Sequence, residues 1–105
     1  MKIKYILLFL VAWMTSMSSS YAQQTVTASG LVMDEKGEAL IGVSVSVKEV
    51  PSMGAITDLD GRFRMTGIKT GNTLLISYIG YDTQEIKMTK SDERMRVVLK
   101  ESANL

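Results

Sequence analysis

Asp58, Asp60 and Gly61 have the residue types and spacing that open a calcium-binding loop. Such a loop also needs a glutamate at its twelfth position, where the side chain supplies two further oxygen ligands. Counting from Asp58, that position is occupied by Lys69. The segment is therefore interpreted as an Asx-type turn, in which Asp58 or Asp60 accepts hydrogen bonds from nearby backbone amides.

A second acidic cluster consists of Asp34, Glu35 and Glu38, close to Gly37. Paired carboxylates perform acid–base chemistry when a pocket moves their pKa values apart. The glycine and the polar neighbours instead indicate a solvated turn, with the aspartate bonding to nearby backbone. We interpret this cluster as a charged loop that favours solubility.

Tyr78 and Tyr81 flank Gly80 and form a third candidate site. Aromatic residues on an exposed strand can bind sugars or peptides, and they can equally pack in a core with their hydroxyl groups satisfied. Both roles stay open from the residues alone, and we favour the structural one. The glycine predicts a bulge or a sharp bend at this point.

The chain contains no histidine and no cysteine. Their absence removes the usual zinc ligands, thiol redox chemistry, and any Ser–His or Cys–His nucleophile pair. No glycine-rich phosphate loop leading into a helix is present. The composition therefore predicts a protein that is not an enzyme and holds no cofactor or metal.

Residues 1–22 have the composition of a secretory signal peptide, which predicts export. Lys2 and Lys4 precede an apolar run too short to span a bilayer, and Ser20 and Ala22 place small residues before the cleavage point. No cysteine follows that could carry a lipid anchor, and we expect no membrane insertion of the mature chain. The net charge is +1 with the two lysines and −1 without them. The scattered basic residues therefore predict no nucleic-acid binding.

The elements that must position these residues are strands, because apolar residues recur at every second position. Val43, Val45 and Val47 alternate with polar residues, as do Phe63 and Met65, and the pattern returns at 95–99. A weaker strand is expected at 26–33. Another strand is expected at 73–79, and it is expected to be central because both its faces are apolar. Connections are expected at 34–37, 51–54, 58–61 and 67–72. About seven short strands predict an all-β, antiparallel β-sandwich.

The order of these motifs resembles a known family. Its opening motif corresponds to Gly30, Leu31, Val32, Asp34, Gly37, Leu40, Gly42, Val43 and Val45, its middle motif to Thr57, Asp58, Gly61 and Phe63, and its last motifs to 77–81 and 97–101. Together they resemble the N-terminal carboxypeptidase-regulatory-like domain of SusC-like TonB-dependent outer-membrane transporters. Ala39 stands where the family usually has proline, which is a local change in a turn.

The resemblance implies a transthyretin-like (prealbumin-like), seven-stranded Greek-key sandwich at 23–101, with 102–105 starting a linker towards a TonB-binding segment. It implies structural roles for Asp34, Gly37, Gly42, Thr57, Asp58, Gly61, Phe63, Tyr78, Gly80 and Tyr81. The chain stops about where the TonB-binding segment would begin, so we expect part of a truncated or split transporter.

The function implied is that of a non-catalytic periplasmic accessory domain, associated with the outer membrane, of a transporter that imports glycans or peptides. Its partners would be the plug and barrel of that transporter and components of the TonB system. The alternative is a free-standing secreted β-sandwich module that binds carbohydrate or peptide. A metallocarboxypeptidase activity is not expected, because the histidine ligands of such enzymes are missing.

The alternating pattern predicts that Phe63 is buried and supports much of the core. Replacing it with alanine (Phe63→Ala) should lower the free energy of unfolding by about 3–5 kcal/mol, through lost apolar burial and the remaining cavity. Denaturant unfolding of the two proteins measures this difference. A loss below about 1 kcal/mol would place Phe63 outside the core.

Overall fold

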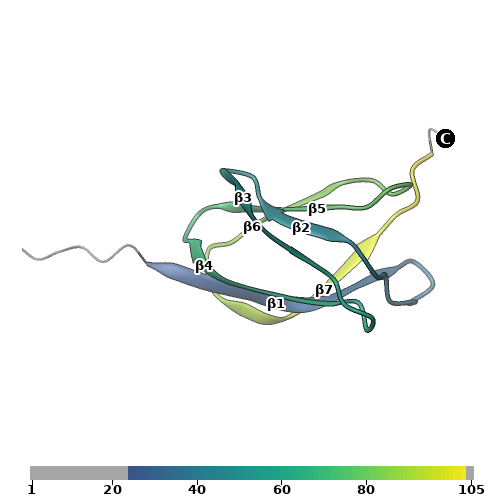
Figure 1. Cartoon of the computed structure of the whole chain (residues 1–105), viewed down its shortest axis with the longest axis horizontal. Coiled ribbons are helices and arrows are strands. Elements are labelled where there is room, and N and C mark those ends of the chain that lie inside the picture. Colours follow the sequence, from purple (N-terminus) through teal and green to yellow (C-terminus); the bar gives the residue numbers. More distant parts are fainter. Residues whose placement is uncertain (1–23, 104–105) are drawn as a thin grey trace, which may run out of the picture.

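The computed structural model of this chain describes residues 24–103, and these residues form strands and turns without a helix (Figure 1). The predicted signal peptide and the last two residues of the predicted linker lie outside the described part. No helix in that part is long and apolar enough to cross a membrane. The strands are β1 (Thr25–Asp34), β2 (Ser44–Val47), β3 (Val50–Ile56), β4 (Arg62–Lys69), β5 (Thr73–Ser77), β6 (Gln84–Lys87) and β7 (Asp92–Leu99).

Two sheets face each other in a sandwich (Figure 1). The first contains three strands in the order β4-β1-β7, and the second contains four in the order β3-β2-β5-β6. β5 lies between β2 and β6, as its two apolar faces predicted. The all-β, seven-stranded sandwich expected from the sequence is confirmed.

The core between the sheets is built from the alternate apolar residues of the strands. Phe63 is 4% exposed, in agreement with the sequence-based expectation. The largest side chains with almost no exposure come from both sheets, whereas the edge strands β3 and β6 contain no buried residue. These largest buried side chains are Ile68, Leu74, Ile76, Leu99, Val32, Val43, Val45, Val47 and Val97.

One strand pair differs from the expected antiparallel arrangement. β1 and β7 run parallel, with Val32 opposite Val97 and Asp34 opposite Leu99. The other strand pairs within the described residues are antiparallel. A parallel pair requires a long crossover, and here the rest of the sandwich forms that crossover. Alternation cannot distinguish the two directions, because side chains alternate between faces in both.

Two expected connections also lie elsewhere. The segment 51–54 belongs to β3, and the turn before it is at Lys48 and Glu49. Pro51 is tolerated because β3 is an edge strand and its register with β2 skips 51–53. The connection expected at 67–72 is shorter than predicted, because β4 continues to Lys69 and buries Ile68.

Candidate functional site

Several connections of the sandwich meet at the end where the chain leaves the domain, to the right in Figure 1. We call this the exit end and define it as the segments 34–43, 57–62, 78–82 and 100–103. Strand pairing brings them together, because β1 and β7 finish side by side where β4 begins. In the other sheet, Ser44 pairs with both Ile56 and Ser77, which aligns the adjoining connections.

Two turns of the exit end share one aspartate-centred structure. Asp34 Oδ1 accepts hydrogen bonds from the backbone N–H groups of Lys36 and Glu38, both at 2.9 Å. Asp58 Oδ1 accepts the corresponding bonds from Asp60 and Arg62, also at 2.9 Å. In each turn one carboxylate oxygen satisfies two backbone donors, which stabilises the turn.

Gly61 completes the second aspartate turn and cannot be replaced without strain. Its φ of 74° lies in the left-handed region, where a side chain is disfavoured. An added Cβ would also lie 2.8 Å from the Val32 carbonyl oxygen and 2.9 Å from the Ala39 Cβ. The Val32 N–H donates to the Gly61 carbonyl at 2.8 Å, so this turn is held against β1.

Thr57 joins the long β1–β2 connection to the end of β3. Its side chain is buried, and its hydroxyl donates to the Leu40 carbonyl at 2.6 Å and accepts from the Val43 N–H at 2.9 Å. Its backbone carbonyl also accepts from the N–H of Gly42, whose φ of 81° turns the chain into β2. One threonine therefore satisfies backbone groups that lie far away in the sequence.

The turn from Tyr78 to Tyr81 holds the departing chain. The Ser102 N–H donates to the Gly80 carbonyl at 2.9 Å, so the backbone after β7 is attached to this turn. Gly80 has a φ of 87° and makes the predicted sharp bend. The two tyrosine rings lie 5.6 Å apart and pack against the core. The structural role that we favoured for the tyrosines stays a prediction.

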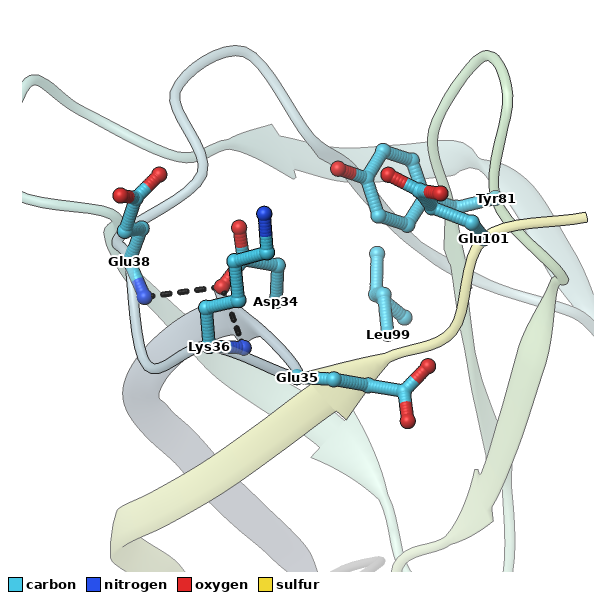
Figure 2. Close-up of a pocket in the computed structure, with 7 residues that line it drawn as sticks. All are labelled: Asp34, Glu35, Lys36, Glu38, Tyr81, Leu99 and Glu101. Atoms are coloured by element: carbon cyan, nitrogen blue, oxygen red, sulfur yellow. Dashed lines mark hydrogen bonds between the residues drawn. The ribbon is translucent and has the colours of Figure 1, made fainter.

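A cleft of about 390 Å³ opens at the exit end beside the first aspartate turn. Figure 2 shows Tyr81 and Glu101 on the side of the cleft opposite that turn, and Leu99 also lines the cleft. Burial raises the pKa of Tyr81, and the negative charges of Glu101 and Asp34 raise it further. The tyrosine hydroxyl therefore stays protonated at neutral pH. Residues 24–103 contain no group of three or more acidic side chains that could hold a metal ion.

The structure gathers nearly all the residues that the sequence singled out, although they come from distant segments. Phe63 is the exception, because it points into the core just inside the exit end. The sequence did not reveal the attachment of 100–103 to the tyrosine turn, which rests on backbone groups that carry no residue-specific signal. The sequence also did not single out Glu101, because its place beside Tyr81 depends on the pairing of distant segments. The residues gathered at the exit end are Asp34, Gly37, Gly42, Thr57, Asp58, Gly61, Tyr78, Gly80 and Tyr81.

These observations define a small β-sandwich module whose motif residues shape its turns and hold the backbone that follows β7. The chain belongs to the CarboxypepD_reg-like domain family, whose sequence model matches residues 28–105. The resemblance drawn from the motifs is thereby confirmed.

Two relatives are TonB-dependent receptors. The chain is 37% identical over 100 residues to the TonB-dependent receptor SusC of Bacteroides thetaiotaomicron, covering 95% of this chain and 9% of SusC. It is 40% identical over 79 residues to the TonB-dependent receptor P39 of Formosa agariphila, covering 75% of this chain and 7% of that receptor. The chain thus spans less than a tenth of the length of either receptor.

Solved structures share the fold at low sequence identity. A domain of 3-chlorocatechol 1,2-dioxygenase from Rhodococcus opacus superposes with a TM-score of 0.58 at 13% identity, covering 82% of this chain and 63% of that chain. The shaft pilin SpaA of Lactobacillus rhamnosus GG gives a TM-score of 0.52 at 13% identity, covering 78% of this chain and 48% of that chain. At such identities the likeness shows the fold alone.

The Thr57 hydroxyl supplies a test of the exit end. Thr57→Val keeps the shape but leaves the Leu40 carbonyl and the Val43 N–H without partners, which should cost about 1–3 kcal/mol of stability. Thr57→Ser keeps the hydroxyl and should cost about 0.8 kcal/mol or less, for one lost methyl group. Urea unfolding of the three proteins measures both effects. Equal losses in the two variants would show that the hydroxyl does not hold this end together.

Proposed function

We propose that this chain is the non-catalytic, periplasmic N-terminal domain of a TonB-dependent outer-membrane transporter that imports glycans or peptides. The observation that carries the proposal is the alignment of 95% of the chain with a small part of the receptor SusC. A segment of this size fits an appended domain. In this proposal, residues 1–22 are a signal peptide, 23–101 are the domain, and 102–105 begin the linker to the next part of the transporter.

The geometry of the exit end supports a role in positioning the next part of the transporter. The backbone at 100–102 is bound to the tyrosine turn through the Asp82–Lys100 and Ser102–Gly80 hydrogen bonds. The chain therefore leaves the sandwich at a fixed place and in a fixed direction. We propose that the recurrent motif residues are structural, and that the domain presents the TonB-binding segment while contacting the plug or components of the TonB system.

A free-standing binding module is the second candidate, and the tyrosines were its main support. Tyr78 and Tyr81 pack against each other and are partly buried against the core, which reduces the aromatic surface that could stack on sugars. We therefore place this candidate below the transporter domain.

Export can be tested by expressing the full 105-residue chain in a bacterium with an outer membrane and measuring the mass of the product in the periplasm. We expect removal of residues 1–22 and an N-terminus at Gln23, because small residues precede that bond. The control variant Ala22→Arg places a bulky charge at the cleavage point and should yield an uncleaved product. Recovery of uncleaved wild-type chain from the cytoplasm would contradict export.

The transporter assignment is tested by reading the genome beyond the codon for Leu105. We expect a coding region for a TonB-binding segment, a plug and a barrel, in the same frame or in the next gene. In a strain that carries this transporter, in-frame deletion of codons 24–101 should impair growth on the imported nutrient and leave growth on glucose unchanged. A downstream region without a transporter would contradict the assignment, whatever the outcome of the export experiment.

A further inference from the structure

All four arginines of the chain lie on the outer face of the three-stranded sheet. Arg62 and Arg64 alternate with the buried Phe63 and Met65 in β4. In β7, arginines 94 and 96 similarly flank the buried Met95. The four arginines are exposed to solvent. The net charge of the chain does not reveal this clustering of arginines, because acidic residues balance their charge.

Three of the arginines form two rows across β1, and Arg94 lies at a register shift in β7. In the first row, Leu31 of β1 pairs with Arg62 on one side and with Arg96 on the other. In the second row, Ser29 pairs with Arg64. Arginines on opposite sides of β1 have backbones about 10 Å apart, and successive arginines along one strand about 7 Å apart.

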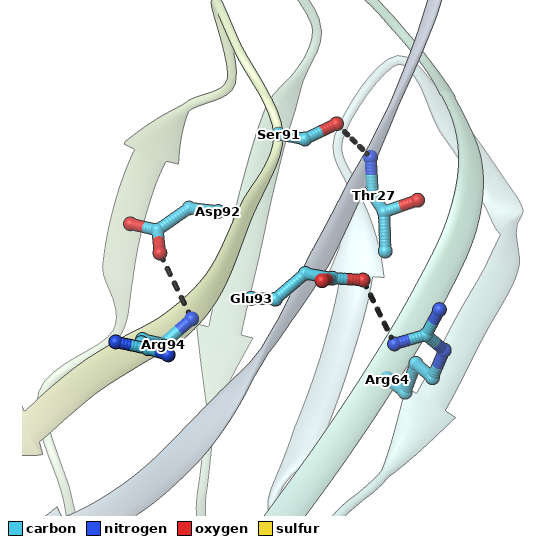
Figure 3. Close-up of polar contacts among 6 residues, drawn as sticks. All are labelled: Thr27, Arg64, Ser91, Asp92, Glu93 and Arg94. Atoms are coloured by element: carbon cyan, nitrogen blue, oxygen red, sulfur yellow. Dashed lines mark hydrogen bonds and ion pairs between the residues drawn. The ribbon is translucent and has the colours of Figure 1, made fainter.

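The second row already contains a carboxylate. The register between β1 and β7 shifts between the Ala28–Asp92 and Gly30–Met95 pairs, so β7 carries one extra residue there. Such a bulge redirects side chains, and Glu93 reaches over β1 to Arg64 (Figure 3). Its Oε1 lies 3.1 Å from the Arg64 Nη1. A carboxylate lying across β1 therefore fits this face.

The first row has the same arrangement of arginine and β1 residue, but its arginines are not paired with a carboxylate. Within residues 24–103, no acidic side chain forms an ion pair with Arg62, Arg94 or Arg96. These three arginines instead line a hollow of about 320 Å³, together with Leu31 and Glu93. The guanidinium group suits such a site, because its planar donors bind carboxylates in a bidentate manner.

We propose that this arginine face binds an acidic polypeptide segment in extended conformation. One partner carboxylate lies over Leu31 between Arg62 and Arg96, as Glu93 lies over Ser29. Side chains two residues apart on an extended segment are about 7 Å apart, which matches the spacing from Arg96 to Arg94. Glutamate or aspartate at alternate positions of a segment that runs along β7 can therefore reach Arg96 and Arg94 in turn. The inference goes beyond the proposed function and does not require it.

A polypeptide fits this face better than an anionic membrane does. The carboxylates of Asp92 and Glu93 are exposed beside the arginines and would repel a continuous layer of anionic headgroups. A peptide can place its charges on the arginines and an uncharged residue beside the glutamate. Charge complementarity is thus local, at the scale of single side chains.

The test measures binding of the full chain to a fluorescein-labelled peptide of repeating Thr-Glu units, by fluorescence anisotropy at low salt. The same peptide with glutamine in place of glutamate should not bind. The double variant Arg62→Gln/Arg96→Gln should weaken binding by about tenfold, as expected for the loss of two exposed ion pairs. The matched control Lys48→Gln/Lys87→Gln removes the same amount of charge from the four-stranded sheet, where Lys48 follows β2 and Lys87 ends β6. It should change the affinity by less than about twofold.

Glu93→Gln provides a second, opposite test, because it removes the resident carboxylate and frees Arg64. This variant should bind the glutamate peptide about threefold more tightly. Equal weakening by the arginine and lysine double variants would overturn the proposal, since the attraction would then depend on net charge alone. Absence of binding to the glutamate peptide would also overturn it, as would arginine-dependent binding to phosphatidylglycerol vesicles that the peptide fails to displace.

Discussion

The packing of two short sheets against one apolar core is the constraint on which the rest of this molecule depends. With no cysteine in the chain, no disulfide can reinforce so small a domain, and burial must provide its stability. Every strand except the edge strands β3 and β6 therefore buries one row of side chains and turns the other row towards solvent. That division fixes Phe63 in the core and the arginines on the outside, so the surface features depend on the core.

At the exit end, polar groups stabilise the connections between the strands that the core brings together. The aspartate turns, Thr57 and the bend at Gly80 satisfy backbone groups where the strands finish, and unpaired backbone groups there would be costly. The motif residues at this end make hydrogen bonds and bends that hold its connections together, which is the basis of the structural role that we propose for them. In a domain proposed to precede a transporter, that geometry determines where the next segment of the chain starts.

The two surfaces of the sandwich have different electrostatic character. The exit end carries the acidic cleft around Asp34 and Glu101, whereas the outer face of β4 and β7 carries the arginines. A near-neutral net charge conceals both, because it sums over the whole chain. The short repeats Arg62-Phe-Arg64 and Arg94-Met-Arg96 contained the signal for the arginine face. The number of basic residues and their scatter along the sequence do not reveal this face, because neither quantity depends on which side of a strand a residue occupies.

The sequence by itself determined the period of the strands, the buried residues such as Phe63 and Val45, and the aspartate turns. These features depend on neighbours within a few residues, so local patterns contain them. Only the tertiary structure decided that β1 and β7 run parallel, that Thr57 binds Leu40 and Val43, and that the chain leaves against Gly80. Side-chain alternation fixes the face of a residue within its strand, but which strands become neighbours depends on pairing between distant segments.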